Sequence, residues 1–218
     1  MAVDQTRVKI CGLRSAEAAL VASDAGADFL GFVFVEGVRR QLLPDEGARI
    51  ISDYKKARTG SNTPRLVGLF RNQDADWVNQ TARQADLDYL QLCGDENYEY
   101  MDGMELPVLK QVRVRKGTTP EKLAGMVSPY LASNRFVVLD RYDRDTPGGS
   151  GRTFDWAAAE GVANLDNVLL AGGINPENVG SAINQLSPWG IDVSTGVETD
   201  GIKDPVRIRA FIDAVRNA

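Results

Sequence analysis

The sequence predicts an α/β fold in which eight parallel strands, each followed by a helix, close into one barrel. Short runs of β-branched and aromatic residues recur eight times along the 218 residues. Each run ends in a small polar or glycine-rich turn, and apolar residues at helical spacing follow it. One unit takes about 27 residues, which is close to the lower size limit of a (β/α)8 TIM barrel. We therefore expect a single barrel domain over residues 1–218.

The predicted strands are mostly continuous apolar runs, as expected for parallel strands that helices cover. They span residues 7–11, 28–34, 65–70, 88–92, 107–112, 135–140, 167–171 and 190–194. A doubly wound open sheet would have the same pattern, but eight repeating units favour a closed barrel.

Helices are expected at residues 15–25, 44–56, 75–84, 119–126, 155–160, 176–186 and 205–216, with a weak helix after Glu96. Ser15, Asn175 and Asp204 are candidate N-caps, because short polar side chains accept hydrogen bonds from the first turn of a helix. A proline follows each of the last two, at the first helical position, where its missing N–H costs nothing.

Charge and composition exclude several classes of partner. The net charge of −5 gives no electrostatic reason to expect nucleic acid or an anionic membrane as a partner. No apolar run approaches the roughly 20 residues of a membrane helix, and the N-terminal segment lacks the pattern of a signal peptide. Two cysteines are too few for a disulfide scaffold in a chain of this length. We expect a cytoplasmic protein.

The chain contains no histidine. Histidine is the usual proton-transfer group near neutral pH and the commonest metal ligand. Acid–base chemistry must therefore use Cys, Asp, Glu, Lys or Tyr, and a zinc site is disfavoured. We expect no metal site.

Cys11 ends the first predicted strand, at the carboxyl-terminal mouth where barrels of this kind hold their active sites. Lys9 shares its face of the strand, about 7 Å below it by strand rise. A nearby ammonium group lowers the pKa of a thiol, so Cys11 is a candidate base. The alternative is a buried small hydrophobic residue, which is the commoner role of a lone cysteine.

Asp140 follows four apolar residues at the end of the sixth predicted strand, so its carboxyl group would face the same mouth. Cys11 and Asp140 could then approach a bound substrate from opposite sides. A solvated turn residue or a helix-cap partner is at least as common for an aspartate at a strand end. Asp143 and Asp145, in the following loop, are expected to be solvated.

Glycine and hydroxyl residues follow the seventh and eighth predicted strands. Barrels that bind phosphorylated substrates often hold the phosphate between these two loops, using backbone N–H groups and a helix N-terminus. The candidate phosphate-binding residues are Gly172, Gly173, Ser194, Thr195 and Gly196. The alternative is that these residues only make turns. GGSG at 148–151 is a weaker candidate, either a flexible lid or an anion-binding loop.

Arg39 and Arg40 interrupt an apolar stretch after the second predicted strand, near the mouth. An arginine suits a carboxylate because its guanidinium group can bond both oxygens. A solvated surface pair is the default interpretation, and one arginine that points inward is the functional one.

Seven motifs, in order along nearly the whole chain, resemble those of the phosphoribosylanthranilate isomerases of tryptophan biosynthesis. They are KICGL (9–13), GADFLGFVF (26–34), VGLF (67–70), YLQLCGDE (89–96), GGSGRTFDW (148–156), LAGGINPENV (170–179) and DVSTGVE (192–198). GGIN recurs in other phosphate-binding barrels, but the set of KICGL, QLxGDE, GGSGxTFDW and DVSxGVE is specific to this family.

The resemblance implies an enzyme that needs no cofactor and converts N-(5-phosphoribosyl)anthranilate into 1-(2-carboxyphenylamino)-1-deoxyribulose 5-phosphate by an Amadori rearrangement. As in similar proteins, Asp140 would be the general acid that protonates the ribose ring oxygen, and Cys11 would remove the C2 proton. Arg40 would bind the anthranilate carboxylate, and the inward-facing Asp192 is a further candidate for substrate contact. We expect a monomer or homodimer that acts on this small molecule.

Two positions depart from the family pattern. Cys93 stands where the family usually has a histidine, in QLHGDE, which puts in doubt any role for an imidazole on the fourth strand. Val38 and Arg39 precede Arg40 where the loop usually reads SPR or SxR. This difference leaves open whether Arg39 or Arg40 binds the carboxylate.

Two other functions stay open at this point. Isomerases of histidine synthesis perform the same rearrangement on an aminoimidazole carboxamide ribotide, but they generally use an aspartate as the base in the first strand, so Cys11 argues against them. A phosphate-binding barrel without turnover is the non-enzymatic alternative, because Cys93 departs from the pattern. Kinetics with both substrates would discriminate between these functions.

Overall fold

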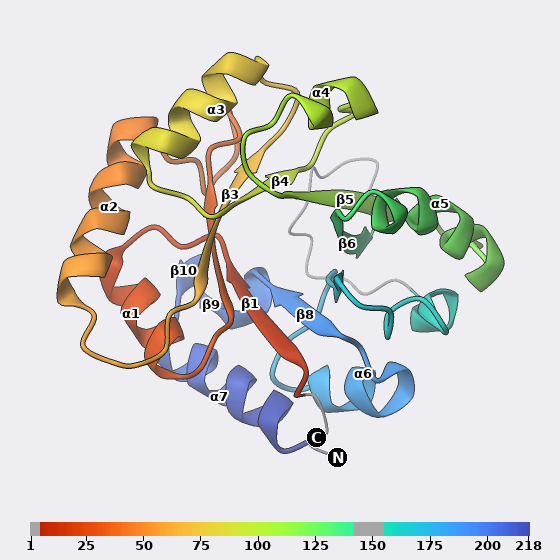
Figure 1. Ribbon diagram of the computed structural model, residues 1–218. Coiled ribbons are helices and arrows are strands. Elements are labelled where there is room, and N and C mark those ends of the chain that lie inside the picture. The colour runs from red at the N-terminus through yellow and green to blue at the C-terminus, as the bar shows by residue number, and fades with distance from the viewer. Residues whose placement is uncertain (1–4, 142–154) are drawn as a thin grey trace.

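The computed structural model describes residues 5–141 and 155–218. Eight parallel strands form a closed ring in chain order, and helices surround it (Figure 1). The strands are β1 (Arg7–Cys11), β2 (Phe29–Val33), β3 (Arg65–Phe70), β4 (Tyr89–Leu92), β5 (Val108–Val114), β6 (Phe136–Arg141), β7 (Val168–Leu170) and β8 (Gly190–Val193). The helices are α1 (Ala16–Asp24), α2 (Pro44–Ala57), α3 (Ala75–Gln84), α4 (Tyr98–Asp102), α5 (Pro120–Ala132), α6 (Val179–Leu186) and α7 (Pro205–Arg216), with short 3-10 helices η1 (Trp156–Ala159) and η2 (Thr195–Val197).

The closed parallel barrel confirms the predicted fold class. Each of the eight predicted strands overlaps an observed one, and the predictions for β3, α3 and α7 match from end to end. Two predicted N-caps are also confirmed. The Ser15 hydroxyl accepts a hydrogen bond from the backbone N–H of Ala18 at 3.1 Å, and the Asp204 carboxylate accepts one from Val206 at 2.8 Å.

Two helices differ from their predicted bounds by more than one residue at an end. α5 continues through Pro129, beyond the predicted end at residue 126, because Tyr130 and Leu131 in its last turn pack against the core. α6 begins at Val179 rather than at residue 176. The Asn175 side chain, predicted as its N-cap, instead closes a separate turn before the helix by accepting two backbone hydrogen bonds.

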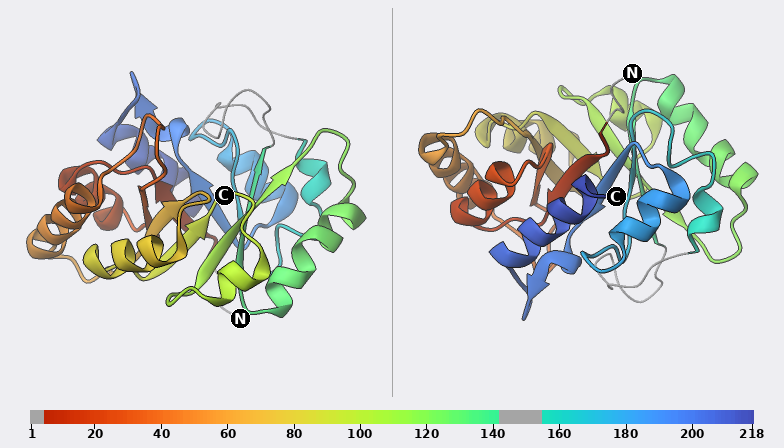
Figure 2. Two further views of the ribbon diagram at one scale, coloured as in Figure 1. Left: turned by 90° about the horizontal axis from the view of Figure 1, so that it is seen from above. Right: turned by 90° about the horizontal axis from the view of Figure 1, so that it is seen from below.

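A two-stranded hairpin, β9 (Glu198–Thr199) and β10 (Ile202–Lys203), was not predicted. Asp200 and Gly201 turn the chain with φ of 51° and 79°, as in the tight hairpin turns that an Asp-Gly pair signals. The flanking strands are too short for their alternation to be recognised. In the left view of Figure 2 the hairpin projects at the upper edge, beside the carboxyl ends of the strands.

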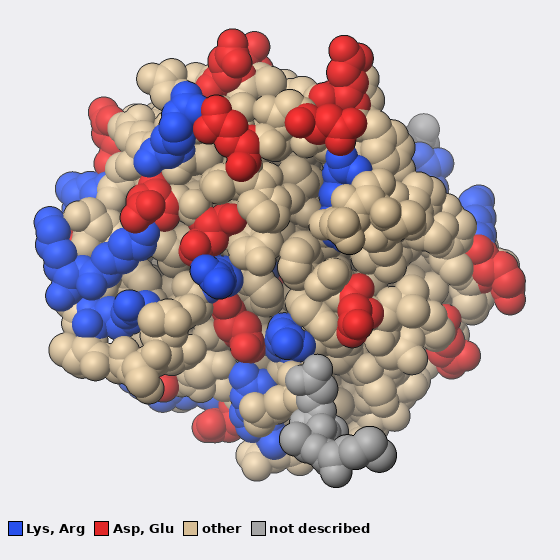
Figure 3. Space-filling model, viewed as in Figure 1, with Lys and Arg blue, Asp and Glu red and all other residues tan. Residues whose placement is uncertain are grey.

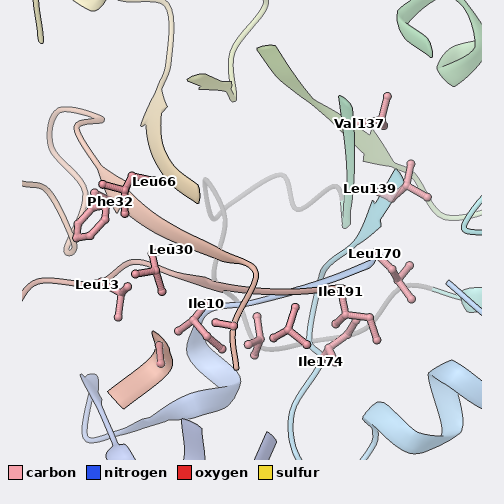
Figure 4. Close-up of a cluster of buried hydrophobic side chains, with 14 of the residues drawn as sticks. Ile10, Leu13, Leu30, Phe32, Leu66, Val137, Leu139, Leu170, Ile174 and Ile191 are labelled. Carbon is pink, nitrogen blue, oxygen red and sulfur yellow. The ribbon is translucent and has the colours of Figure 1, made fainter. Parts of the chain in front are cut away.

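Alternate residues of each strand face opposite sides of the barrel wall. The outward-facing residues, among them Ile10, Leu30 and Ile191, form the core between the strands and the helices (Figure 4). The inward-facing residues form a second cluster inside the barrel, made of Cys11, Phe29, Val33, Val35, Val67, Leu69, Leu109, Val138, Leu169 and Ala171. This division confirms that Cys11 points into the barrel and Ile10 away from it.

Four aromatic side chains close the lower end of the barrel, where the strands begin. Phe29, Tyr89, Phe136 and Trp189 come from β2, β4, β6 and the residue before β8, and each ring contacts the next at centroid distances of 5.3–6.4 Å. Side chains from alternate strands fill such a barrel in layers. The interior is therefore closed below and can open only at the mouth.

One ion pair is buried inside the barrel above this aromatic layer. The Lys9 ammonium group lies 3.0 Å from the Asp192 carboxylate, across the β1–β8 pairing that aligns the two residues. Lys9 is 0% exposed and Asp192 is 8% exposed. Each charge is costly to bury alone, so the two groups depend on each other.

Charges of both signs are interspersed on the face seen in Figure 3, with basic side chains gathered over α2 at its left edge. The last turn of α2 carries Lys55 and Lys56. Among the residues described, no helix combines the length and apolarity that crossing a membrane requires.

We predict that Lys9→Met lowers the free energy of unfolding by about 3–5 kcal/mol, because it leaves the Asp192 carboxylate buried without a partner. Urea unfolding at pH 7 measures the change. The control is Arg65→Met, which breaks an exposed pair with Asp88 and should cost less than about 1 kcal/mol. Equal losses in the two variants would show that the interior pair is not desolvated.

Candidate active site

Cys11 is the last residue of β1 and faces the interior at the mouth. Its partner on β2 is Gly31, where a Cβ atom would lie 3.0 Å from the Cys11 sulfur. Glycine therefore leaves the space that the thiol occupies. The Ser194 hydroxyl donates a hydrogen bond to the Cys11 carbonyl at 3.0 Å, which ties the end of β1 to the loop after β8.

The expected lowering of the Cys11 pKa is wrong in its net direction. Burial raises the pKa of the thiol, the Lys9 charge lowers it, and the Asp192 charge raises it again, so the pKa lies above its ordinary value. Lys203 also lowers it. Lys9 shares the inward face of β1 with Cys11, as predicted, but burial outweighs the effect of its charge. Cys11 is therefore mainly a neutral thiol at neutral pH.

Asp140 lies near the end of β6 and is half-buried at the same mouth. One carboxyl oxygen accepts a hydrogen bond from the Gln111 amide at 2.7 Å, and the other accepts one from the Arg141 backbone at 2.8 Å. Burial raises the pKa of this carboxyl to about 6, assisted by the Asp192 charge and opposed by these hydrogen bonds and Arg113. Asp140 can thus hold a proton far closer to neutral pH than an ordinary aspartate.

Asp192, expected as a substrate contact, lies below the mouth and is occupied by its pair with Lys9. Its charge acts on both Cys11 and Asp140. The candidate acid and base therefore share one buried carboxylate as an electrostatic neighbour. Its position favours support of these two groups over direct contact with a ligand.

The loops after β7 and β8, which carry the candidate phosphate-binding residues, lie against each other. A Cβ atom on Gly196 would lie 2.0 Å from the Ile174 carbonyl, so only glycine permits this approach. Ser194 precedes η2, and Thr195 is the first residue of this short helix.

Gly172 and Gly173 connect the loop after β7 to the candidate acid. Both have positive φ, at 85° and 70°, where glycine is favoured. A Cβ atom on Gly172 would lie 3.1 Å from the Asp140 carboxyl oxygen, and the Asn178 amide donates a hydrogen bond to the Gly173 carbonyl. The predicted phosphate loops therefore adjoin the end of β6.

The two arginines of the loop after β2 differ in position. The Arg39 side chain is 50% exposed and bonds the Gly201 carbonyl and the Glu198 carboxylate in the hairpin. The Arg40 side chain is 15% exposed and passes over Gly12, where a Cβ atom would lie 2.4 Å from its Cδ atom. Gly12 directly follows Cys11, so Arg40 is the arginine that reaches the mouth.

Glu198 and Lys203, which the sequence analysis did not single out, lie beside these arginines. The Lys203 ammonium donates hydrogen bonds to the Glu198 carboxylate at 2.6 Å and to the Ser194 carbonyl at 2.9 Å. Burial alone would raise the pKa of Glu198, but hydrogen bonds from Arg40, Lys203 and Arg39 lower it to about 2. Glu198 is therefore an anion throughout the physiological pH range.

Cys93, at the position where the family that the chain resembles usually has a histidine, packs against the inward-facing cluster. Its sulfur accepts a hydrogen bond from the Gln91 amide at 3.6 Å. Burial raises the pKa of this thiol to about 12, with a smaller contribution from Cys11. Cys93 therefore stays neutral near pH 7 and can serve there neither as an acid nor as a base.

GGSG at 148–151, together with Asp143 and Asp145, lies outside the described residues. Within residues 5–141 and 155–218, no cluster of three or more Cys, Asp or Glu side chains is arranged to hold a metal ion.

Comparisons with known proteins identify a family for this chain. The family described as N-(5'-phosphoribosyl)anthranilate (PRA) isomerase matches residues 8–214. An N-(5'-phosphoribosyl)anthranilate isomerase of Dehalococcoides mccartyi is 41% identical over 215 residues, which cover 97% of this chain and 96% of the relative. The phosphoribosyl anthranilate isomerase structure from Thermotoga maritima superposes with a TM-score of 0.83 at 30% identity, covering 98% of this chain and 100% of that one.

A further solved structure is phosphoribosyl anthranilate isomerase in complex with reduced 1-(o-carboxyphenylamino)-1-deoxyribulose 5-phosphate. It is 29% identical, with a TM-score of 0.79 and coverage of 98% of this chain and 100% of that one. These matches extend over almost the whole chain, in sequence and in fold. The chain belongs to the N-(5'-phosphoribosyl)anthranilate isomerase family.

Proposed function

We propose that this chain converts N-(5-phosphoribosyl)anthranilate into 1-(2-carboxyphenylamino)-1-deoxyribulose 5-phosphate in tryptophan biosynthesis, with Cys11 as the base and Asp140 as the acid. The main support is that a thiol and a carboxyl group of raised pKa face one barrel mouth, next to two glycine-lined loops. The relative bound to the reduced form of this product supports the same substrate. Rescue of a tryptophan auxotroph that lacks this isomerase tests the activity.

Asp140 donates its proton to the ribose ring oxygen, and the C1–O bond breaks to leave an iminium group at C1. Cys11 then removes the proton from C2, because the iminium draws electrons from the neighbouring C–H bond. The C2–H electron pair forms the C1–C2 double bond and neutralises the iminium nitrogen. The resulting enolamine tautomerises to the ketose. No external electron donor or acceptor is needed, because the oxidation of C2 balances the reduction of C1.

Each remaining residue has a role that follows from its position. Gly172, Gly173, Ser194, Thr195 and Gly196 hold the substrate phosphate in the adjoining loops after β7 and β8. Arg40 binds the anthranilate carboxylate, because its side chain lies over Gly12 next to the base. The cationic iminium that forms near Cys11 adds to the Lys9 charge and favours the thiolate as the reaction proceeds.

We further propose that residues 1–218 act as one barrel domain in the cytoplasm, as a monomer or a homodimer. The family match over residues 8–214 supports one domain. A Thermotoga maritima relative is described as dimeric, which supports the homodimer. Sedimentation of the purified chain at several concentrations measures the oligomeric state.

We predict that Cys11→Ala lowers turnover by several orders of magnitude while the fold is retained, because it removes the thiol that we propose takes the C2 proton. Steady-state kinetics and circular dichroism measure both properties. Cys93→Ala is the matched control, since it removes the only other thiol and should change turnover by less than about tenfold. Full activity of Cys11→Ala would refute the assigned role.

We predict that Asp140→Asn abolishes ring opening but leaves product binding, because the amide keeps the shape of the carboxyl group and has no acidic proton at neutral pH. Single-turnover kinetics measure the chemical step, and titration with reduced product measures binding. If turnover is unchanged, another group must protonate the ring oxygen.

The two pKa shifts predict an unusual pH profile. Asp140 titrates near pH 6 and Cys11 above its ordinary value, so between these values most molecules carry a carboxylate and a thiol. The active form, with a carboxylic acid and a thiolate, is a minor species. Its fraction is constant between the two pKa values and decreases at pH values below the Asp140 pKa. The value of kcat/KM should therefore rise with pH up to about 6 and then level off.

Gln111→Leu tests whether Asp140 causes the acidic limb of this profile, which is the rise of kcat/KM with pH. The variant removes a hydrogen bond that stabilises the Asp140 carboxylate. The Asp140 pKa should rise, which moves the limb to higher pH and raises the plateau, provided that the variant binds substrate normally. A limb that stays in place would belong to the substrate phosphate, which also titrates near pH 6.

A further inference from the structure

Three cationic side chains converge on the Glu198 carboxylate at the edge of the mouth. Arg40 donates from Nε at 2.7 Å and from Nη2 at 3.0 Å, Arg39 from Nη2 at 2.6 Å, and Lys203 from Nζ at 2.6 Å. The Glu198 side chain is only 5% exposed. This cluster carries three positive charges and one negative charge. Its net charge is therefore +2, and it can accept another anion.

The bonds to Glu198 use one edge of the Arg40 guanidinium group. A guanidinium has five N–H donors, and Glu198 occupies those of Nε and one of Nη2. The edge formed by Nη1 and the second N–H of Nη2 remains, and no described residue accepts a hydrogen bond from Nη1. A second carboxylate could therefore bind this edge through both of its oxygens without displacing Glu198.

Both ends of the arginine are thereby held. Its Cδ atom lies over Gly12, which follows Cys11, and its head group is fixed by Glu198. Lys203 links the same carboxylate to the Ser194 carbonyl in the proposed phosphate loop. Glu198 thus connects the proposed carboxylate and phosphate contacts of one substrate.

We propose that Glu198 is a positioning residue that holds Arg40 so that its remaining edge receives the substrate carboxylate, and that it thereby determines specificity for a carboxylated aryl amine. This inference rests on the proposed function. A free arginine would lose side-chain entropy on binding the substrate, whereas an arginine that Glu198 already holds has lost it before the substrate binds.

The test compares kcat/KM for N-(5-phosphoribosyl)anthranilate with that for N-(5-phosphoribosyl)aniline, which lacks the carboxylate. Glu198→Gln should lower the ratio of the two values about three- to tenfold, through a higher KM for the anthranilate at nearly unchanged kcat. Loss of the link from Lys203 to the phosphate loop affects both substrates alike and cancels in the ratio. Arg40→Met, which removes the contact itself, should lower the ratio further.

Three variants separate positioning from charge and from folding. Glu198→Asp keeps the charge, but its side chain is one methylene too short to accept both hydrogen bonds from Arg40. It should therefore behave like Glu198→Gln. Adding Lys203→Met to Glu198→Gln removes the buried ammonium that would otherwise lose its partner, and this double variant should show the same lowered ratio. Glu105→Gln, which breaks a pair with Arg83 at the other end of the barrel, should leave the ratio unchanged.

An unchanged or raised ratio in a folded Glu198→Gln chain would overturn the inference, and so would a wild-type ratio in Glu198→Asp. In both cases the wild-type chain still isomerises the anthranilate, so the proposed function stands. Absence of turnover by the wild-type chain would refute the proposed function and this inference together.

Discussion

Closure of eight parallel strands into a ring sends every second side chain into a narrow interior, and the whole site depends on how that interior is filled. Four aromatic rings close the lower end, aliphatic side chains follow, and the buried Lys9–Asp192 pair lies above the rings. Cys11 and Asp140 lie above this filling, at the mouth. The same filling removes water from around Cys11 and Asp140, which is the main cause of their raised pKa values.

The charges of this site are arranged around two carboxylates rather than around the reacting groups. Asp192 pairs with Lys9 inside the barrel and acts electrostatically on both Cys11 and Asp140. Glu198, at the rim, gathers Arg39, Arg40 and Lys203. The first carboxylate tunes proton affinity, and the second leaves an excess of positive charge where an anionic substrate would enter. Electrostatic preorganisation of this kind needs no rearrangement at the moment of reaction.

Three glycines at the mouth permit close approaches between the backbone and neighbouring groups. Gly31 makes room for the Cys11 thiol, Gly12 for the Arg40 side chain, and Gly196 for the contact between the loops after β7 and β8. A Cβ atom at Gly12 or Gly196 would collide with a neighbour, and one at Gly31 would crowd the Cys11 side chain. These positions let the backbone at the mouth bring groups from distant parts of the sequence together.

The sequence by itself determined the strands, the barrel and the strand-end positions of Cys11 and Asp140, because continuous apolar runs and the turn residues that end them are local signals. It also led to the family, through motifs spread along the whole chain. Only the tertiary structure revealed Glu198, Lys203 and Gln111, whose partners lie 5 to 159 residues away. It also decided between Arg39 and Arg40 as the arginine at the mouth, and it reversed the expected direction of the Cys11 pKa. The physical reason is that burial and long-range ion pairing depend on the neighbours that folding supplies, and neither leaves a periodic trace in the chain.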